Sequence, residues 1–458
     1  MMQGWSAGEI AAITGGCLLA GNSQAEIRGV TIDSRTIRPG NLFIAFKGEK
    51  TDGHDYVGQA FEQGAAACLV ERPVQDNRLA VILVENTLNA LGRLAGHHRL
   101  AYRGHLIGVT GSNGKTTTKD MIASILAQKW HILKTLGNYN NEIGLPLTLL
   151  KLTPDTQAAV VEFGMRRKGQ IKALAHIALP TAAVLTNVGE AHMEMLGSKE
   201  AIADAKGELI EAVPADGMVV LNADDPYLAE QGKKSAAKVI GYGLKGRFGR
   251  LDYRGEDPES DGVIQKFNLY CARGRIGLEI MLPGLHNIYN ALAASALCLE
   301  LGLDPEDVQE GLRHFIPGDK RLNIIRLNEI TIIDDTYNAS PTSTLAALEI
   351  LAYYPGKRKI AILGDMLELG RAAVDGHRLV GKKAAELGIR ILATGPLAWE
   401  IVNAARPVLG PDGSRHFGRK EDIIEFIRGI REPDDVYLVK GSRGMRMETI
   451  VKALKGEE

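Results

Sequence analysis

The chain has 458 residues, which is too long for one hydrophobic core and suits about three domains of ordinary size. Its 54 Lys and Arg nearly balance 55 Asp and Glu, so no overall charge favours nucleic acid or an anionic membrane. The four widely spaced cysteines contain no CxxC pair, which disfavours a zinc site and a disulfide framework. Because no signal peptide and no membrane-length apolar run is present, we expect a cytoplasmic protein without nucleic-acid or membrane partners.

The first two thirds of the chain predict two α/β domains. Apolar runs separated by polar turns, "VTID", "LFIAF", "AACLV" and "AVILV", indicate a small domain over residues 1–102. From residue 105, the buried-strand run "HLIGVTG" leads into a helical pattern. The runs "AAVVEF", "TAAVLTN" and "GMVVLN" then predict a parallel sheet with both faces covered. We expect this central domain to span 103–317, with antiparallel strands between 240 and 282 and a packed helix in "LPGLHNIYNALAASALCLELG".

The last third predicts a third domain. "FIPGDKR" joins a Pro-Gly breaker to charged residues and marks the expected boundary. After it, the strand-like runs "ITIIDD", "RKIAILGD", "IRILATG" and "DVYLVKG" alternate with helical segments. This alternation favours a Rossmann-like, doubly wound domain over 318–458, so the expected fold class is α/β with three domains.

The stretch "GVTGSNGKTTTK", residues 108–119, predicts a phosphate loop. Gly111 and Gly114 supply backbone freedom before a helix, Lys115 a charge for the phosphates, and Thr116 a hydroxyl for Mg²⁺. The strict GxxxxGK[ST] pattern requires glycine where this chain has Val109, and a Gly-Lys-Thr triplet also occurs in solvated loops. The preceding strand and following helix favour nucleotide binding, and the candidate ATP-binding residues here are Thr110, Gly111, Ser112, Asn113, Gly114, Lys115, Thr116 and Thr117.

Three residues downstream of the loop are candidates for metal-assisted chemistry. Glu162 ends the run "AAVVEF", where strand ends open onto the ligand crevice, so it could hold Mg²⁺ or merely close a strand. His192, in "TNVGEAHMEMLGS", could face the same crevice or lie on the surface. Lys206, in "ADAKGEL", would by default be a solvated helix lysine.

Together these stretches resemble the Mur ligase family, ATP-dependent enzymes that add amino acids to the UDP-muramoyl peptide of the bacterial cell wall. The family loop TGxxGKT matches Thr110–Thr116, so Val109 is not anomalous. The resemblance implies that Thr116, Glu162, His192 and Lys206 are metal ligands for two Mg²⁺ ions, with Lys206 carrying a CO₂-derived carbamate. Lys115, Glu162, His192 and Lys206 are the implied catalytic residues.

Within the family, the chain is most similar to members that join D-alanyl-D-alanine to UDP-N-acetylmuramoyl-tripeptide through an acyl phosphate. The matching stretches are "LKTLGNYNNEIGLPLTLL", "FGMRRKGQI", "NVGEAHMEMLGS", "LPGLHNIYNALAA", "DDTYNASPTS", "LGDMLELG" and "KGSRGMRME". "DNPR" and "DYAHTP", typical of the ligase that adds the third residue, are absent. The acceptor's third residue stays open between diaminopimelate and lysine.

The resemblance also implies the remaining binding residues. For the adenosine and γ-phosphate of ATP they are Asn287, Asn290, Arg321, Asp335 and Tyr337, although Asn287 could instead cap a helix. For the UDP substrate they are Ser34, Arg35, Lys47, Gly48, Asp52, His54, Asn138, Asn140 and Asn141. For D-alanyl-D-alanine they are Asn338, Ser340 and Asp365, although a strand-end Asp such as Asp365 often caps the next helix.

Three alternatives remain at this point. One is another amide ligase of the family, such as a folate polyglutamylating enzyme, which normally begins close to its phosphate loop. The second is a P-loop switch or motor, and the third a nucleotide-binding regulatory module without turnover. For the ligase we expect a monomer and, from the hinge at Pro317 and Gly318, a more open form without ATP.

Overall fold

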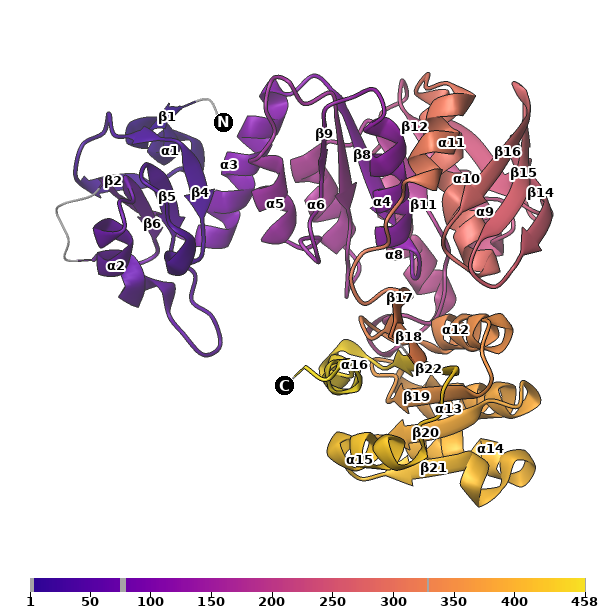
Figure 1. The fold of residues 1–458 in the computed structure, drawn as a ribbon. Coiled ribbons are helices and arrows are strands. Elements are labelled where there is room, and N and C mark those ends of the chain that lie inside the picture. Colours follow the sequence, from indigo (N-terminus) through magenta and orange to yellow (C-terminus); the bar gives the residue numbers. More distant parts are fainter. Residues whose placement is uncertain (1–3, 75–79, 328, 458) are drawn as a thin grey trace.

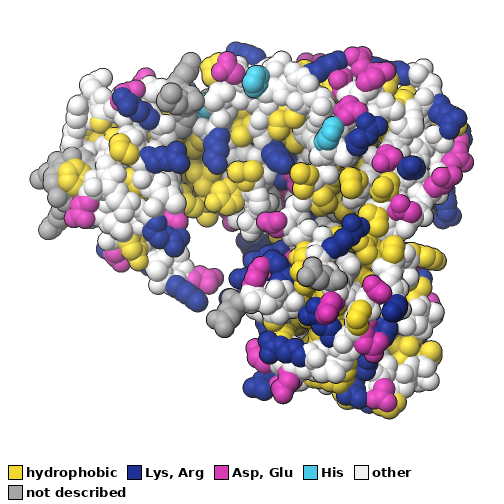
Figure 2. Space-filling model, viewed as in Figure 1, with side chains coloured by type: hydrophobic (Ala, Val, Ile, Leu, Met, Phe, Trp, Pro, Cys, Tyr) yellow, Lys and Arg dark blue, Asp and Glu magenta, His cyan; other side chains and the backbone are white. Residues whose placement is uncertain are grey.

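The computed structural model describes residues 4–74, 80–327 and 329–457. Within these ranges the chain forms three large sheets in succession, each covered by helices, which confirms the α/β three-domain class (Figure 1). The N-terminal and C-terminal parts attach to different sides of the central part, and the surface is hollowed between them (Figure 2). Of the described helices, none combines the length and apolarity that crossing a bilayer requires.

The N-terminal part contains a five-stranded sheet in the order β2-β7-β6-β5-β4, in which only the β2–β7 pair is antiparallel. The apolar runs expected there form β4 to β7, and the sequence pattern missed β2 and the small β1–β3 pair. The elements are β1 Trp5–Ser6, α1 Ala7–Thr14, β2 Cys17–Ala20, β3 Glu26–Ile27, β4 Gly29–Thr31, β5 Asn41–Ile44, α2 Val57–Glu62, β6 Ala67–Val70, β7 Ala80–Leu83 and α3 Thr87–Ala101.

The central part contains a nine-stranded sheet in the order β16-β15-β14-β13-β12-β11-β8-β10-β9. Strands β8 to β14 are parallel, and the expected antiparallel strands, β14 to β16, extend the same sheet through the β13–β14 pair. The strands are β8 His105–Thr110, β9 Ile132–Lys134, β10 Ala158–Glu162, β11 Ala182–Leu185, β12 Met218–Asn222, β13 Lys238–Gly243, β14 Tyr253–Ser260, β15 Gln265–Cys271 and β16 Gly274–Ile280. The helices are α4 Lys115–Leu126, α5 Gly144–Leu149, α6 Gln170–Ala178, α7 Met193–Leu196, α8 Lys199–Glu211, α9 Pro226–Gly232, α10 Leu285–Glu300 and α11 Pro305–Arg313.

The C-terminal part contains a six-stranded sheet in the order β17-β18-β22-β19-β20-β21, parallel except for β17. The edge strands β17 and β21 were not expected, because their short, mixed sequences carry no apolar run. The strands are β17 Asn323–Arg326, β18 Ile330–Asp335, β19 Lys359–Gly364, β20 Arg390–Thr394, β21 Ser414–Phe417 and β22 Asp435–Lys440. The helices are α12 Pro341–Tyr353, α13 Ala373–Glu386, α14 Ala398–Gly413, α15 Lys420–Ile430 and α16 Glu448–Lys455.

The two faces of the central sheet bury separate apolar clusters. On one face, α4 and the alanine-rich α10 pack together, and Met121, Ile122, Ile125 and Leu126 of α4 are buried as their helical spacing predicts. On the other face, α5, α6 and α8 cover the strands, and α3 joins them. Buried side chains of α3 thus belong to the same cluster as those of α6, which fixes the N-terminal part against the central one. The expected boundaries, 102/103 and 317/318, fall in the connections between sheets.

The turn that ends α6 offers a test of backbone strain. Leu179 caps the helix with φ of 47° and ψ of 65°, a left-handed conformation that favours glycine, and its side chain is 41% exposed. We therefore expect Leu179→Gly to raise the free energy of unfolding by about 1 kcal/mol, measured by urea denaturation. The control is Leu100→Gly, an exposed leucine near the end of α3, which should lower it by about 1 kcal/mol. Equal losses in both variants would contradict the assignment of strain to Leu179.

Candidate functional site

The phosphate loop connects β8 to α4 and has the glycines where its geometry requires them. Gly111 has φ of 153°, and a Cβ there would lie 1.9 Å from the Thr186 hydroxyl oxygen. Gly114 has φ of 80° at the start of α4, and a Cβ there would lie 2.4 Å from Asn290 Oδ1. The loop therefore leads tightly from β8 into the positive end of α4, where a phosphate is favoured.

The end of β11 holds this loop, a support that the sequence did not reveal. The Asn113 N–H donates to Asn187 Oδ1 at 2.9 Å, and the Ser112 N–H donates to the Asn187 carbonyl at 2.9 Å. The Thr186 hydroxyl donates to the Asn113 carbonyl at 2.6 Å. Both supporting residues lie in "TAAVLTN", so polar residues at the end of that strand were the available signal.

Lys115 folds back over the loop. Its ammonium donates to the carbonyls of Gly111 at 2.8 Å and Ser112 at 3.2 Å. Burial lowers the pKa of Lys115, Glu162 opposes that effect, and the positive charge of Arg321 adds to it. An anion bound at this position would be a charged hydrogen-bond partner for the Lys115 ammonium, in place of the loop carbonyls.

Glu162 at the end of β10 is fixed through both carboxylate oxygens. The Thr116 hydroxyl donates to Oε2 at 2.6 Å, and the Asn140 amide donates to Oε1 at 2.8 Å. The carboxylate is 2% exposed, and its backbone N–H donates to the Thr135 hydroxyl at 3.1 Å. The structure thus brings three of the predicted residues together, and hydroxyl and carboxylate oxygens are ligands that Mg²⁺ accepts.

The neighbouring asparagines differ in their roles. Asn138, Asn140 and Asn141 all line the cavity described below. Asn141 Oδ1 accepts the backbone N–H groups of Ile143 and Gly144, at 3.2 and 2.9 Å, so it also stabilises the start of α5.

Lys206 lies on α8 and is 1% exposed. The alternative that it is a solvated helix lysine is therefore wrong. Burial first, and the charge of Lys115 second, lower its pKa well below the ordinary value. Within the described ranges, no hydrogen bond or ion pair joins its amine to a carboxylate. The Lys206 amine thus lies at the cavity wall without an anionic partner among the described residues.

His192 starts the short helix α7 with φ of 65° and lies at the contact with the C-terminal part. Its Nδ1 lies 3.0 Å from Glu368 Oε2, and this hydrogen bond lowers the pKa of the Glu368 carboxyl. The sequence did not identify Glu368, which lies within "LGDMLELG". A second contact nearby joins the Thr342 hydroxyl to Glu190 Oε2 at 2.6 Å, so the central and C-terminal parts meet beside the phosphate loop.

Asn287 and Asn290 lie inside α10, both buried. Gly284 starts the helix, so the alternative that Asn287 is its cap is wrong. Asn287 donates to the Pro283 carbonyl at 2.7 Å and accepts from Asn290 at 3.0 Å. Asn290 also accepts the Thr118 hydroxyl at 3.2 Å, which ties α10 to α4.

Arg321 enters the cavity from the hinge before β17. The residues on both sides of it, Lys320 and Leu322, have φ of 63° and 50°, conformations that cost free energy for residues other than glycine. The guanidinium carbon of Arg321 lies 3.8 Å from the centre of the Tyr337 ring, so two of the expected ATP-binding side chains stack on each other.

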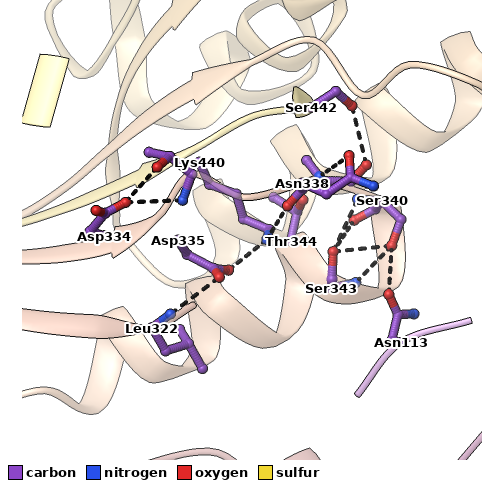
Figure 3. Close-up of polar contacts among 12 residues, drawn as sticks. Asn113, Leu322, Asp334, Asp335, Asn338, Ser340, Ser343, Thr344, Lys440 and Ser442 are labelled. Atoms are coloured by element: carbon purple, nitrogen blue, oxygen red, sulfur yellow. Dashed lines mark hydrogen bonds and ion pairs between the residues drawn. The ribbon is translucent and has the colours of Figure 1, made fainter. Parts of the chain in front are cut away.

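Asp335 is part of a network at the end of β18 (Figure 3). Its Oδ2 lies 2.5 Å from the ammonium of Lys440, and its Oδ1 accepts the Leu322 N–H at 3.3 Å. Lys440, 3% exposed, also donates to the Asn338 carbonyl at 2.9 Å. Lys440 lines the cavity and was missed by the sequence analysis, although it begins the stretch "KGSRGMRME".

The dipeptide candidates separate into two groups. Asn338 and Ser340 line the cavity, and Ser340 also starts α12 and donates to Asn113 Oδ1 at 3.4 Å (Figure 3). Asp365 does not line this cavity, and its Oδ1 accepts the Ala398 N–H at 2.7 Å at the start of α14. In this structure Asp365 therefore caps a helix, as the alternative held. Its place in the dipeptide site is not supported by the cavity.

The six N-terminal candidates lie outside this cavity: Ser34, Arg35, Lys47, Gly48, Asp52 and His54. Arg35 is exposed and pairs with Asp33 at 2.7 Å, which lowers the pKa of that carboxyl to about 2. His54 is buried, with Nδ1 2.6 Å from Asp52 Oδ1 and Nε2 accepting the Glu71 N–H. Both of its nitrogens are thus engaged in holding the loop, whereas Lys47 and Gly48 are exposed.

One cavity of about 1290 Å³ unites the central and C-terminal residues. Its wall includes the phosphate loop, Glu162, His192, Lys206, Asn287, Asn290, Arg321, Asp335, Tyr337, Asn338 and Ser340. Among the described residues, no three His, Cys, Asp or Glu side chains group as a metal site. The wall thus offers cations, a fixed carboxylate and helix N–H groups, a combination suited to moving a phosphoryl group between anions.

The His286 side chain, half-buried at the cavity wall, gives a pH test of the site. Burial lowers its pKa to about 4, against about 6.5 in an unfolded chain, so acid favours unfolding. Between about pH 6.5 and 4, only the unfolded state binds this proton, and the free energy of unfolding falls as the pH falls. We expect His286→Gln to reduce this fall in the free energy of unfolding, measured by urea denaturation at a series of pH values. Parallel curves for the two proteins would contradict the assigned burial.

Comparison with known proteins identifies the family. The Mur ligase middle domain matches residues 109–298, the glutamate ligase domain of Mur ligases matches 320–443, and the catalytic domain of the Mur ligase family matches 26–99. The UDP-N-acetylmuramoyl-tripeptide–D-alanyl-D-alanine ligase of Bacillus subtilis (strain 168) is 40% identical over 436 residues, 94% of each chain.

Two solved structures support the same family. The UDP-N-acetylmuramoylalanyl-D-glutamyl-2,6-diaminopimelate–D-alanyl-D-alanyl ligase from Acinetobacter baumannii is 32% identical, with a TM-score of 0.88, covering 100% of this chain and 99% of its own. MurF ligase from Thermotoga maritima, in complex with ADP, is 30% identical with a TM-score of 0.82, covering 94% of this chain and 97% of its own. On the family models, the full-length identity and the shared fold, this chain belongs to the Mur ligase family.

Proposed function

We propose that this enzyme uses ATP to join D-alanyl-D-alanine to UDP-N-acetylmuramoyl-tripeptide, giving the UDP-linked pentapeptide, ADP and phosphate in peptidoglycan synthesis. The observation that carries this proposal is the shared cavity, in which Lys115 and Lys206 of the central part face Arg321 of the C-terminal part. The relative from B. subtilis, with 94% of each chain matched, supports the same substrates. The ADP-bound relative supports ATP as the phosphoryl donor.

The reaction needs an activated acid, because an amine cannot expel oxide from a carboxylate. A carboxylate oxygen of the tripeptide bonds to the γ-phosphorus of ATP, and the bond from that phosphorus to ADP breaks. The dipeptide nitrogen then bonds to the carbonyl carbon of the acyl phosphate. The carbon–oxygen bond breaks, phosphate leaves, and the nitrogen loses its proton.

The central difficulty is the approach of two anions. Lys115 and Arg321 line the cavity and would offset the negative charge of the carboxylate and the γ-phosphate. The hydroxyl of Thr116 beside the buried Glu162 carboxylate suits one Mg²⁺ ion, and His192 with a carbamate on Lys206 would hold a second. When bound, the two ions supply Lewis-acid charge that draws electron density from the transferring phosphoryl group.

The surroundings of Lys206 support the proposed carbamate. Burial and Lys115 lower the pKa of Lys206, which favours the neutral amine that attacks CO₂, forming a nitrogen–carbon bond and releasing a proton. The resulting anion would lie near the charge of Lys115, which stabilises it. An unmodified lysine offers no oxygen ligand.

The remaining sites follow the division of the chain. We propose that exposed residues of the N-terminal part, with Arg35 foremost, contact the UDP group, and that Asn138 and Asn140 contact the sugar or peptide. Asn287, Asn290, Asp335 and Tyr337 would surround the adenosine. Asn338 and Ser340 would contact the dipeptide. We further propose a monomer that works in the cytoplasm, where ATP is available.

One assay tests the function. Purified enzyme with ATP, Mg²⁺ and UDP-N-acetylmuramoyl-tripeptide should release ADP and form the pentapeptide when D-alanyl-D-alanine is added. ADP release should be far lower with single D-alanine or with no amine. Equal ADP release in all three mixtures would instead indicate a P-loop hydrolase, such as a switch or motor.

A second experiment tests the carbamate. With ¹³C-bicarbonate, NMR of the wild-type protein should show a carbamate signal that is lost in Lys206→Met and kept in Lys172→Met, whose lysine is exposed on α6. We expect Lys206→Met to lose activity by about 100-fold or more, because one charge-stabilising group is removed. A signal that survives in Lys206→Met would assign the modification elsewhere.

A further inference from the structure

Two arginines in the loop after β10 face the cavity without acidic partners. Arg166 and Arg167 are both exposed, and both line the cavity. Within the described ranges, neither guanidinium forms a hydrogen bond or an ion pair. The charge of Arg166 nevertheless lowers the pKa of Glu368, the partner of His192, so this arginine lies on the side of the proposed acyl-transfer centre.

The backbone that carries these arginines is firmly fixed. Gln170 Oε1 accepts the N–H groups of Arg166 at 2.6 Å and Arg167 at 2.9 Å. The buried carboxylate of Glu208, on α8, accepts the N–H groups of Gly169 at 2.6 Å and Lys172 at 2.9 Å. Because α8 also carries Lys206, the arginines are held in a defined position relative to the proposed metal ligand.

The cavity extends from these arginines toward the N-terminal part. Ala173, Leu174 and Ile177 of α6 continue its wall. Ile177 packs on α3, where a Cβ added to Gly92 would lie 3.2 Å from its Cδ1. A peptide that runs from a UDP group on the N-terminal part to Lys206 would therefore pass along α6 and beside Arg166 and Arg167.

We propose that Arg166 and Arg167 bind the carboxylates of the acceptor peptide that do not react. This inference rests on the proposed function. The acceptor named for the Acinetobacter relative contains D-glutamyl and diaminopimelate residues. A glutamyl residue joined through one carboxyl keeps the other, and diaminopimelate keeps one carboxyl when the second is activated. Arginine suits these groups because its planar fork donates two parallel hydrogen bonds to a carboxylate.

Kinetics of single variants test the assignment. For Arg166→Ala and Arg167→Ala, we expect kcat/KM for the UDP-tripeptide to fall about tenfold each, with the KM for ATP unchanged. Lys168→Ala is the matched control, since Lys168 lies next to them, exposed but not part of the cavity wall, and it should leave both constants unchanged. A rise in the KM for ATP in the arginine variants would mean that they bind nucleotide, and would overturn the inference.

Altered acceptors then identify the carboxylate. One acceptor has its D-glutamyl carboxylate converted to the amide, and another has lysine in place of diaminopimelate. Wild-type enzyme should lose activity on at least one of them, and the arginine variants should show a smaller loss on that same acceptor. The inference would be overturned if wild type and variants lost the same activity on the altered acceptor. It would also be overturned if the variants lost no activity on the normal acceptor. The proposed function is tested separately, because it fails only if wild-type enzyme makes no pentapeptide.

Discussion

Removal of the Lys206 amine from water is the constraint on which this site depends, and the nearby charge of Lys115 adds to it. Lys206 is 1% exposed and Lys115 is half-buried, both line one cavity, and within the described ranges neither forms an ion pair with a carboxylate. The Lys115 ammonium donates to loop carbonyls, and burial together with the charge of Lys115 lowers the pKa of Lys206. Lys115 and Arg321 supply positive charge at this cavity, where we propose that phosphate and carboxylate anions bind. The carboxylate of Glu162, held by Thr116 and Asn140, is the fixed negative group beside them.

Constrained backbone in the C-terminal part completes the cavity. Lys320 and Leu322 keep left-handed conformations around Arg321, and the hydrogen bond from Leu322 to Asp335 and the ion pair of Asp335 with Lys440 hold that geometry. Such strain persists only where surrounding contacts enforce it. The contacts of Glu190 with Thr342 and of His192 with Glu368 join the central and C-terminal walls of the cavity.

The sequence predicted the features whose causes are local. A buried apolar run, two glycines and an amphipathic segment suffice to predict β8, the loop and α4, and the end of β10 predicted where Glu162 would lie. The partners of these residues were not predictable, because they come from segments far away in the sequence. Examples are Asn187, Glu368 and Lys440. Asp365 shows the same limit, because the hydrogen bond from the start of α14, 33 residues further along the chain, decides between a cap and a pocket residue. The ligand roles of the site residues stay predictions until tested.

The contact between Gly114 and Asn290 has an evolutionary consequence. The amide oxygen of Asn290 fills the space that a side chain at position 114 would need, and it also accepts a hydrogen bond from α4. The phosphate loop and α10, far apart in the chain, are therefore neighbours that cannot drift independently. Across divergent descendants of this enzyme, we expect the two positions to change together or not at all.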